Sequence, residues 1–93
     1  MNKNKLKKAR IKIDQLDNKI FNLIKKRTKI VKHMLSLKKY KSQIVDKARI
    51  NQVIKKIRKK SIINKVDSKV TIKIWKSMIW SYVDYQRRNF RRK

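Results

Sequence analysis

Apolar residues recur at helical spacing over the first part of the chain. One row repeats every seven residues from Leu6 to Met34, and a second row runs from Ala9 to Leu37. Together they predict a helical seam of nearly five heptads, because side chains at this spacing share one face of an α-helix. We expect a first helix over roughly residues 5–40, about 50 Å long at ~1.5 Å per residue.

A second helix is expected after a break in this pattern. The apolar spacing fades across residues 40–43. Asp46 then suits a helix start, because a carboxylate accepts hydrogen bonds from the unpaired N–H groups there. The predicted helix covers roughly residues 46–61, and its apolar face comprises Ile50, Val53, Ile54 and Ile57.

A third helix is expected over roughly residues 67–90. In the break before it, Asn64 suits a left-handed helix end and Asp67 suits the next cap. An apolar row at i, i+4 spacing defines its face, and neighbouring residues widen the stripe: Val70, Ile74, Met78 and Tyr82, with Trp75, Ile79 and Val83.

The pattern predicts an all-α fold of three helices, long, short and long, in a single domain over residues 1–93. The chain contains no Gly for hairpin turns that need a positive φ, which argues against a sheet-rich fold. Three such helices enclose little core, since a small chain buries a low fraction of its surface. The first helix would leave much of its seam in water in a monomer, so we expect a homodimer.

The chain is strongly basic. It has 31 Lys and Arg against 5 Asp and Glu, a formal charge of +26, which attracts polyanions. The lysines are scattered along the whole chain, whereas a nucleic-acid arm is a block of like charges. A basic helical nucleic-acid-binding protein is therefore kept as an alternative, with the tail over residues 87–93 as its best support, but nucleic acid is not the expected primary partner.

Composition excludes most catalytic classes. Without Cys there is no disulfide, thiolate metal site or cysteine nucleophile, and without Gly there is no phosphate-binding glycine loop. His33 is the single histidine, which excludes multi-histidine metal sites. We therefore expect neither a metal nor a cofactor. Since no apolar run approaches ~18 residues and no signal peptide is visible, we expect a cytoplasmic protein without a membrane partner.

Polar residues interrupt the apolar rows at informative places. Arg27 occupies a seam position between Ile20 and Met34. A buried guanidinium without a partner costs several kcal/mol, and the chain has no Glu and only five Asp to pair with it. The missing anion is then a ligand, unless the side chain reaches outward to solvent.

Further polar residues lie at or beside the apolar rows: Arg10, Lys38, Arg49 and Gln86. Lys38 follows Arg27 by 11 residues, almost three helical turns, and so is expected on nearly the same side. Gln86 continues the third row one i+4 step beyond Tyr82. Any one of these residues alone is more often a solvated surface residue than a ligand-binding residue. Together they place several cations and one amide toward the interior of the helical fold, where few acidic residues can neutralise them.

Motifs around these residues resemble a known family. The first helix of the all-α chorismate mutase family is similar to Arg10-x-x-Ile13-Asp14-x-x-Asp17, followed by Leu23-Ile24-x-x-Arg27 and Val31 through Lys38. The start of its second helix resembles Ile44-Val45-Asp46-x-x-Arg49. Its third helix, especially in the branch with isochorismate-pyruvate lyases, is similar to Ile74-Trp75-x-x-Met78-Ile79-Trp80-x-Tyr82-x-x-x-Gln86.

The resemblance implies an intertwined, domain-swapped helical homodimer with two equivalent sites. One subunit would supply most of the substrate-binding residues, namely Arg27, Lys38, Asp46, Arg49, Tyr82 and Gln86, and the other would supply Arg10. Geometry agrees, because Arg10 and Lys38 would lie ~42 Å apart on one helix, too far for one small ligand. Only an antiparallel partner helix brings an Arg10 to that face.

The implied reaction is the pericyclic rearrangement of the dicarboxylate chorismate to prephenate, in aromatic amino acid biosynthesis. Arg10 and Arg27 would grip the carboxylates, and Lys38 and Gln86 would act as the catalytic donors to the ether oxygen. Family mutases usually carry Glu after the second-helix Arg, and here that position is Ile50. An isochorismate-pyruvate lyase or an amino-deoxychorismate mutase with the same cationic pocket therefore remains an alternative.

Overall fold

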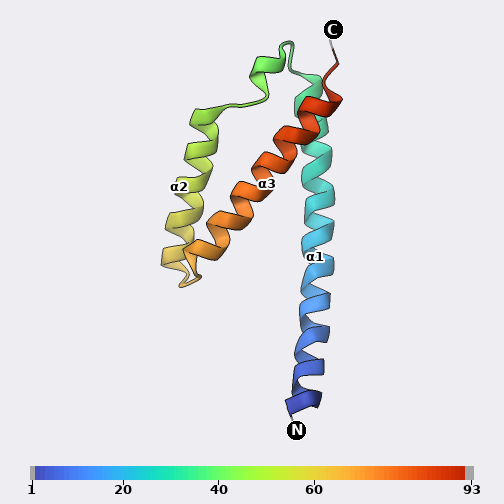
Figure 1. The fold of residues 1–93 in the computed structure, drawn as a ribbon, viewed down its shortest axis with the longest axis vertical. Coiled ribbons are helices and arrows are strands. Elements are labelled where there is room, and N and C mark those ends of the chain that lie inside the picture. Colours follow the sequence, from blue (N-terminus) through green and yellow to red (C-terminus); the bar gives the residue numbers. More distant parts are fainter. Residues whose placement is uncertain (1, 92–93) are drawn as a thin grey trace. The chain divides into compact units, whose positions relative to one another are not determined.

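A computed structural model describes residues 2–91 (Figure 1). They form α1 (Asn2–Ser36), a short 3₁₀ helix η1 (Lys41–Gln43), α2 (Lys47–Ile63) and α3 (Ser68–Asn89), and this part of the chain has no strand. The all-α prediction and the order of long, short and long helices are confirmed. The chain divides into two compact units, Met1–His33 and Met34–Lys93. That residues 1–93 form one domain stays a prediction.

The first helix ends earlier than predicted. α1 stops at Ser36, and the side-chain oxygen of Gln43 accepts hydrogen bonds from the backbone N–H groups of Lys39 (2.8 Å) and Tyr40 (2.9 Å). These N–H groups would otherwise continue the helix. Lys38 therefore lies just beyond α1, so the prediction that places it within the first helix is wrong.

Local caps position the other two helices as predicted. Oδ1 of Asp46 accepts from the backbone N–H of Arg49 at 3.0 Å, which satisfies one of the unpaired donors at the start of α2. Asp67 does the same for Lys69 at 2.8 Å at the start of α3. The observed helices begin within one residue of the predicted starts.

The turn between α2 and α3 contains a left-handed residue, but it is Lys65 and not Asn64. Lys65 has a φ of 56°, whereas Asn64 has a φ of −91°. The N–H of Val66 donates to the carbonyl of Ser61 at 2.9 Å, and the N–H of Lys65 donates to the carbonyl of Ile62 at 3.3 Å. These two bonds form a Schellman motif, in which the left-handed residue comes directly after the C-cap. In a chain without Gly, a lysine takes this position.

α2 and α3 form an antiparallel helical hairpin within the second unit (Figure 1). Ile44, Ile54 and Val83 are its buried apolar residues. Two hydroxyls join the helices near the turn: Ser61 is 5% exposed, and its Oγ lies 2.6 Å from Oγ1 of Thr71. A polar contact therefore fixes the register of the hairpin beside its apolar core.

The apolar stripe of α3 is rotated from the predicted one. Val70 and Ile74 are 52% and 53% exposed, whereas Met78 and Tyr82 are half-buried. Successive i+4 positions advance about 40° around a helix, so a long i+4 row leaves the packed face. The face that is buried or half-buried comprises Ser68, Thr71, Ile72, Trp75, Met78, Ile79, Tyr82, Val83, Tyr85 and Gln86.

The seam of α1 in the first unit is exposed. Six of its residues have more than half of their surface accessible: Leu6, Ile13, Leu16, Ile20, Leu23 and Ile30. A single helix cannot cover its own apolar face, and large exposed apolar patches are uncommon on monomeric proteins. No helix among residues 2–91 is long and apolar enough to cross a membrane.

Candidate functional site

Two predicted site residues, distant in sequence, meet in the second unit. Lys38 follows the end of α1, and Gln86 lies in the last turns of α3. Nζ of Lys38 donates a 2.7 Å hydrogen bond to Oε1 of Gln86, which is 8% exposed. Nε2 of Gln86 donates to the carbonyl of Tyr82 at 3.2 Å. Both ends of the amide are therefore held by hydrogen bonds, and the second N–H of Nε2 can donate to a ligand.

The electrostatic environment of Lys38 favours strong interaction with an anion. Burial lowers the pKa of the Lys38 ammonium below its ordinary value, and the nearby Asp46 carboxylate opposes that shift in pKa. A partly desolvated ammonium interacts more strongly with a ligand charge than one in bulk water.

Asp46 and Arg49 lie at the start of α2. Asp46 caps the helix, as described, and lines the same hollow as Lys38. The Arg49 side chain is exposed, and its Nη1 donates to Oε1 of Gln52 at 3.2 Å. Within this unit the structure therefore brings Asp46 to Lys38, but not the guanidinium of Arg49.

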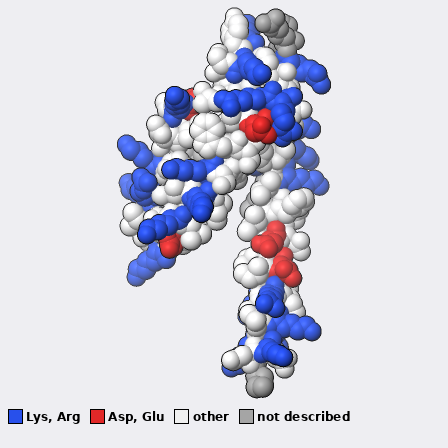
Figure 2. Space-filling view, viewed as in Figure 1, with Lys and Arg blue, Asp and Glu red and all other residues white. Residues whose placement is uncertain are grey.

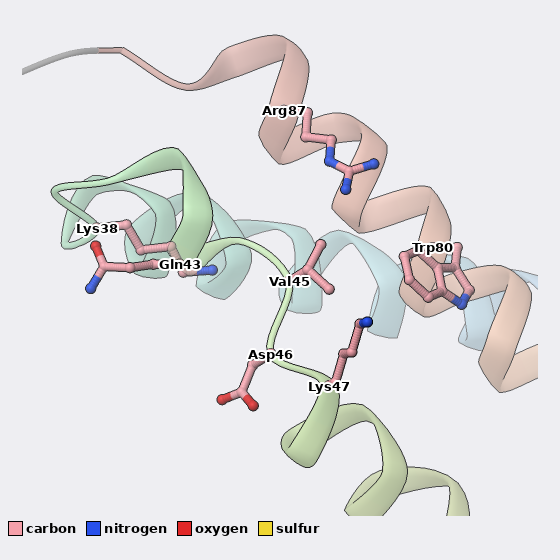
Figure 3. Close-up of a pocket in the computed structure, with 7 residues that line it drawn as sticks. All are labelled: Lys38, Gln43, Val45, Asp46, Lys47, Trp80 and Arg87. Carbon is pink, nitrogen blue, oxygen red and sulfur yellow. The ribbon is translucent and has the colours of Figure 1, made fainter.

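The hollow has a volume of about 830 Å³ and lies between the segment after α1 and α3 (Figure 3). Its lining comprises Lys38, Gln43, Val45, Asp46, Lys47, Trp80 and Arg87. Lys47, Trp80 and Arg87 were not predicted from the sequence. Adjacency was the signal for the two cations, because Lys47 follows Asp46 and Arg87 follows Gln86, whereas Trp80 stands in the third-helix motif.

The remaining predicted residues are placed as follows. Tyr82 is half-buried on α3, one turn before Gln86, and is not part of the hollow's lining. Arg10 and Arg27 belong to α1 in the first unit, where Arg10 is exposed and Arg27 half-buried. Their approach to Lys38 and Gln86 stays a prediction.

Charge and donor types restrict the chemistry of the site. Lys and Arg side chains are scattered over the face shown in Figure 2, with few carboxylates among them. Among residues 2–91, no cluster of His, Asp or Glu could hold a metal ion. The hollow and the Lys38–Gln86 pair combine cations with an amide, which suits a small anion that needs positioning and charge stabilisation.

Comparison with known proteins assigns the family. The sequence profile of the chorismate mutase type II family matches residues 9–87. The chain belongs to this family. Neither the curated proteins nor the solved structures gave a significant match. The resemblance of the sequence motifs is confirmed.

The family indicates chorismate mutase activity, with chorismate as substrate. The matched segment contains all the predicted site residues, from Arg10 to Gln86, and it extends one residue further to Arg87. For a chorismate mutase, an ammonium and an amide held together are the donor types that can stabilise charge developing on an oxygen.

Proposed function

We propose that this chorismate mutase converts chorismate to prephenate with Lys38 and Gln86 as the donors to the ether oxygen. The rearrangement is unimolecular and needs no nucleophile. The protein must hold the compact conformer and stabilise negative charge as the ether bond breaks. The observation that carries the proposal is the 2.7 Å bond between these two side chains, 48 residues apart in sequence.

Gln86 suits this role because its amide can donate at any pH. Its carbonyl oxygen is occupied by Lys38, which orients the amide so that Nε2 is the end available to a ligand. Lys38 retains two further N–H groups beyond the one bonded to Gln86. One substrate oxygen can therefore accept from both side chains.

The carboxylates of the substrate would be held by arginines. Arg27 and Arg49 would come from one subunit and Arg10 from a second copy, with Asp46 and Tyr82 completing the contacts. Arg10 lies 26 residues before Ser36 on α1, about 39 Å at ~1.5 Å per residue, which is too far to serve a site near Lys38 in its own chain.

An intertwined homodimer would supply that second Arg10. The exposed seam of α1 supports it, because an antiparallel copy of the helix would cover the apolar row and reverse its direction. Each of two equivalent sites would then contain residues of both chains. The enzyme would act in aromatic amino acid biosynthesis.

Ile50 favours a second candidate, an isochorismate-pyruvate lyase or an amino-deoxychorismate mutase. Ile50 is half-buried in the first turn of α2. Its backbone N–H donates a 2.9 Å hydrogen bond to the backbone carbonyl of Asp46. An aliphatic side chain cannot accept a hydrogen bond from a substrate hydroxyl. The same cationic pocket would accommodate an isomer whose hydroxyl lies elsewhere.

Product analysis tests the proposal. Purified protein is incubated separately with chorismate and isochorismate, and the products are separated by chromatography. Prephenate from chorismate is expected, with kcat strongly reduced by Lys38→Met and unchanged by the matched variant Lys73→Met on the exposed side of α3. Salicylate and pyruvate from isochorismate, without prephenate, would establish the lyase instead. No reaction, with tight and steeply salt-dependent binding of DNA or RNA, would favour the nucleic-acid alternative.

A further inference from the structure

Two cations from different helices face the hollow beside Lys38. Lys47 comes from the first turn of α2, and Arg87 from the last turn of α3. Figure 3 shows the ammonium of Lys47 and the guanidinium of Arg87 directed into the same space, next to the ring of Trp80. Neither cation belongs to the family motifs described above.

No carboxylate neutralises this pair. Among residues 2–91, neither Lys47 nor Arg87 has an ion-pair or side-chain hydrogen-bond partner, whereas the neighbouring Arg88 pairs with Asp84 at 2.9 Å. Asp46 is the acidic residue in the lining, but its carboxylate caps α2 and points away from both cations (Figure 3). Like charges facing one hollow repel, and a bound anion relieves that repulsion.

The rest of the lining suits a ligand with a ring. Trp80 is 47% exposed on α3, and Val45 is half-buried in the same lining (Figure 3). An accessible indole ring offers a flat apolar surface to an unsaturated six-membered ring. A guanidinium can hold a carboxylate through two parallel hydrogen bonds, and an ammonium adds a compact charge.

We infer that Lys47, Trp80 and Arg87 form an outer subsite that captures the ring dicarboxylate substrate before it reaches Lys38 and Gln86. The inference rests on the proposed function for the identity of the ligand. Lys38 lines the same hollow and also bonds to Gln86, so it connects the outer subsite to the donor pair. The subsite would act on substrate capture, because cations focused in a cleft raise the association rate of an anion by about 10- to 1000-fold.

Steady-state kinetics at increasing ionic strength test the capture role. The double variant Lys47→Gln/Arg87→Gln should lower kcat/KM for chorismate about tenfold, mainly through KM, and flatten its salt dependence. The matched double variant Lys73→Gln/Lys76→Gln removes the same charge from α3 outside this hollow and should change neither. Equal effects in both variants, or a loss confined to kcat, would overturn the inference.

A binding measurement keeps the test independent of turnover. The chain has two Trp, so Trp75→Phe leaves Trp80 as the single reporter, and Gln86→Leu slows the reaction while it leaves the lining of the hollow unchanged. Chorismate should quench Trp80 fluorescence in this background, and Lys47→Gln/Arg87→Gln should weaken that binding about tenfold. Absence of quenching refutes the subsite even if turnover occurs. Quenching with no prephenate from the parent protein refutes the proposed reaction and retains the subsite.

Discussion

Nζ of Lys38 donates a 2.7 Å hydrogen bond to Oε1 of Gln86, and this bond joins the segment after α1 to the C-terminal turns of α3. It fixes a charged donor and a neutral donor against each other before any ligand arrives. Donors that are already oriented need little rearrangement as charge develops on the substrate, which is the main source of electrostatic stabilisation in enzyme sites.

The alkaline limb of the pH profile should report Lys38. Burial lowers the pKa of its ammonium, so the donor is lost at a lower pH than for an exposed lysine. The protonated form predominates below that pKa, and therefore kcat/KM should fall as pH rises through it. Lys38→Arg retains its charge over this range. In a pH series at constant ionic strength, the activity of Lys38→Arg should be reduced but should not fall at alkaline pH. A parent protein whose pH profile is as flat as that of the variant would contradict the role of Lys38.

Gln86→Glu should convert a pH-independent donor into a pH-dependent one. An ionised carboxylate only accepts hydrogen bonds, so kcat/KM at neutral pH should fall about 100- to 1000-fold, the range for losing one oriented donor. Activity should recover as pH falls and the carboxyl becomes protonated. Gln86→Leu cannot donate at any pH and serves as the control, so recovery in that variant as well would argue against donation by residue 86.

The helix caps were predictable from the sequence, whereas the end of α1 was not. Asp46 and Asp67 each bond to an N–H within three residues, so short stretches of sequence contain the whole interaction. The end of α1 depends instead on the side chain of Gln43, seven residues beyond Ser36, and no Gly or Pro in the sequence indicates where the helix stops.

Ile50→Glu should raise kcat/KM for chorismate. A hydrogen-bond acceptor in the first turn of α2 would pair with a substrate hydroxyl that otherwise has no partner. The difference of ~1–3 kcal/mol corresponds to roughly a tenfold to hundredfold change in kcat/KM. A carboxylate at that place also interacts favourably with the helix N-terminus. Ile50→Gln provides a neutral acceptor of the same length as a comparison. If both variants lose activity on chorismate while turnover of isochorismate is high in the parent, the lyase is favoured.

Sedimentation equilibrium at micromolar concentration should give about twice the chain mass of 11.4 kDa. The exposed seam of α1 is the reason, because an antiparallel copy would cover it. Leu23→Asp places a charge in the seam and should yield inactive monomer. Asn22→Asp introduces the same side chain one position away, off the seam, and should leave the dimer intact. A fully active monomer would contradict the shared site.

The hydroxyl pair between α2 and α3 should contribute measurably to stability. Ser61→Ala removes the 2.6 Å contact with the Thr71 hydroxyl and the 2.7 Å bond that Ser61 donates to the carbonyl of Ile57, and each such hydrogen bond contributes about 0.5–1.5 kcal/mol to the free energy of unfolding. In urea denaturation at fixed protein concentration, the double variant Ser61→Ala/Thr71→Val should lose less free energy of unfolding than the two single variants lose in sum. Ser77→Ala, at an exposed position of α3, should change stability by less than about 0.5 kcal/mol.

The outer half of the site could not be predicted because it depends on contacts between distant segments. Arg87 lies off the packed face of α3, and periodicity alone assigns such a position to solvent, whereas Trp80 stands in the third-helix motif but is 47% exposed. They become part of a hollow only because the segment over residues 38–47 passes that side of the helix. Lys38 and Gln86, in contrast, were indicated by polar residues at apolar rows and by the family motifs.

The hairpin of α2 and α3 also determines the order in which the chain acquires its parts. Its helices are joined by a four-residue turn over residues 64–67, so their contacts close short loops at little entropic expense. The Lys38–Gln86 bond closes a loop of 48 residues and requires the hairpin as its platform. We expect the two donors to meet in a late step of folding. A chain can therefore reach its full helical content while it is still incapable of catalysis.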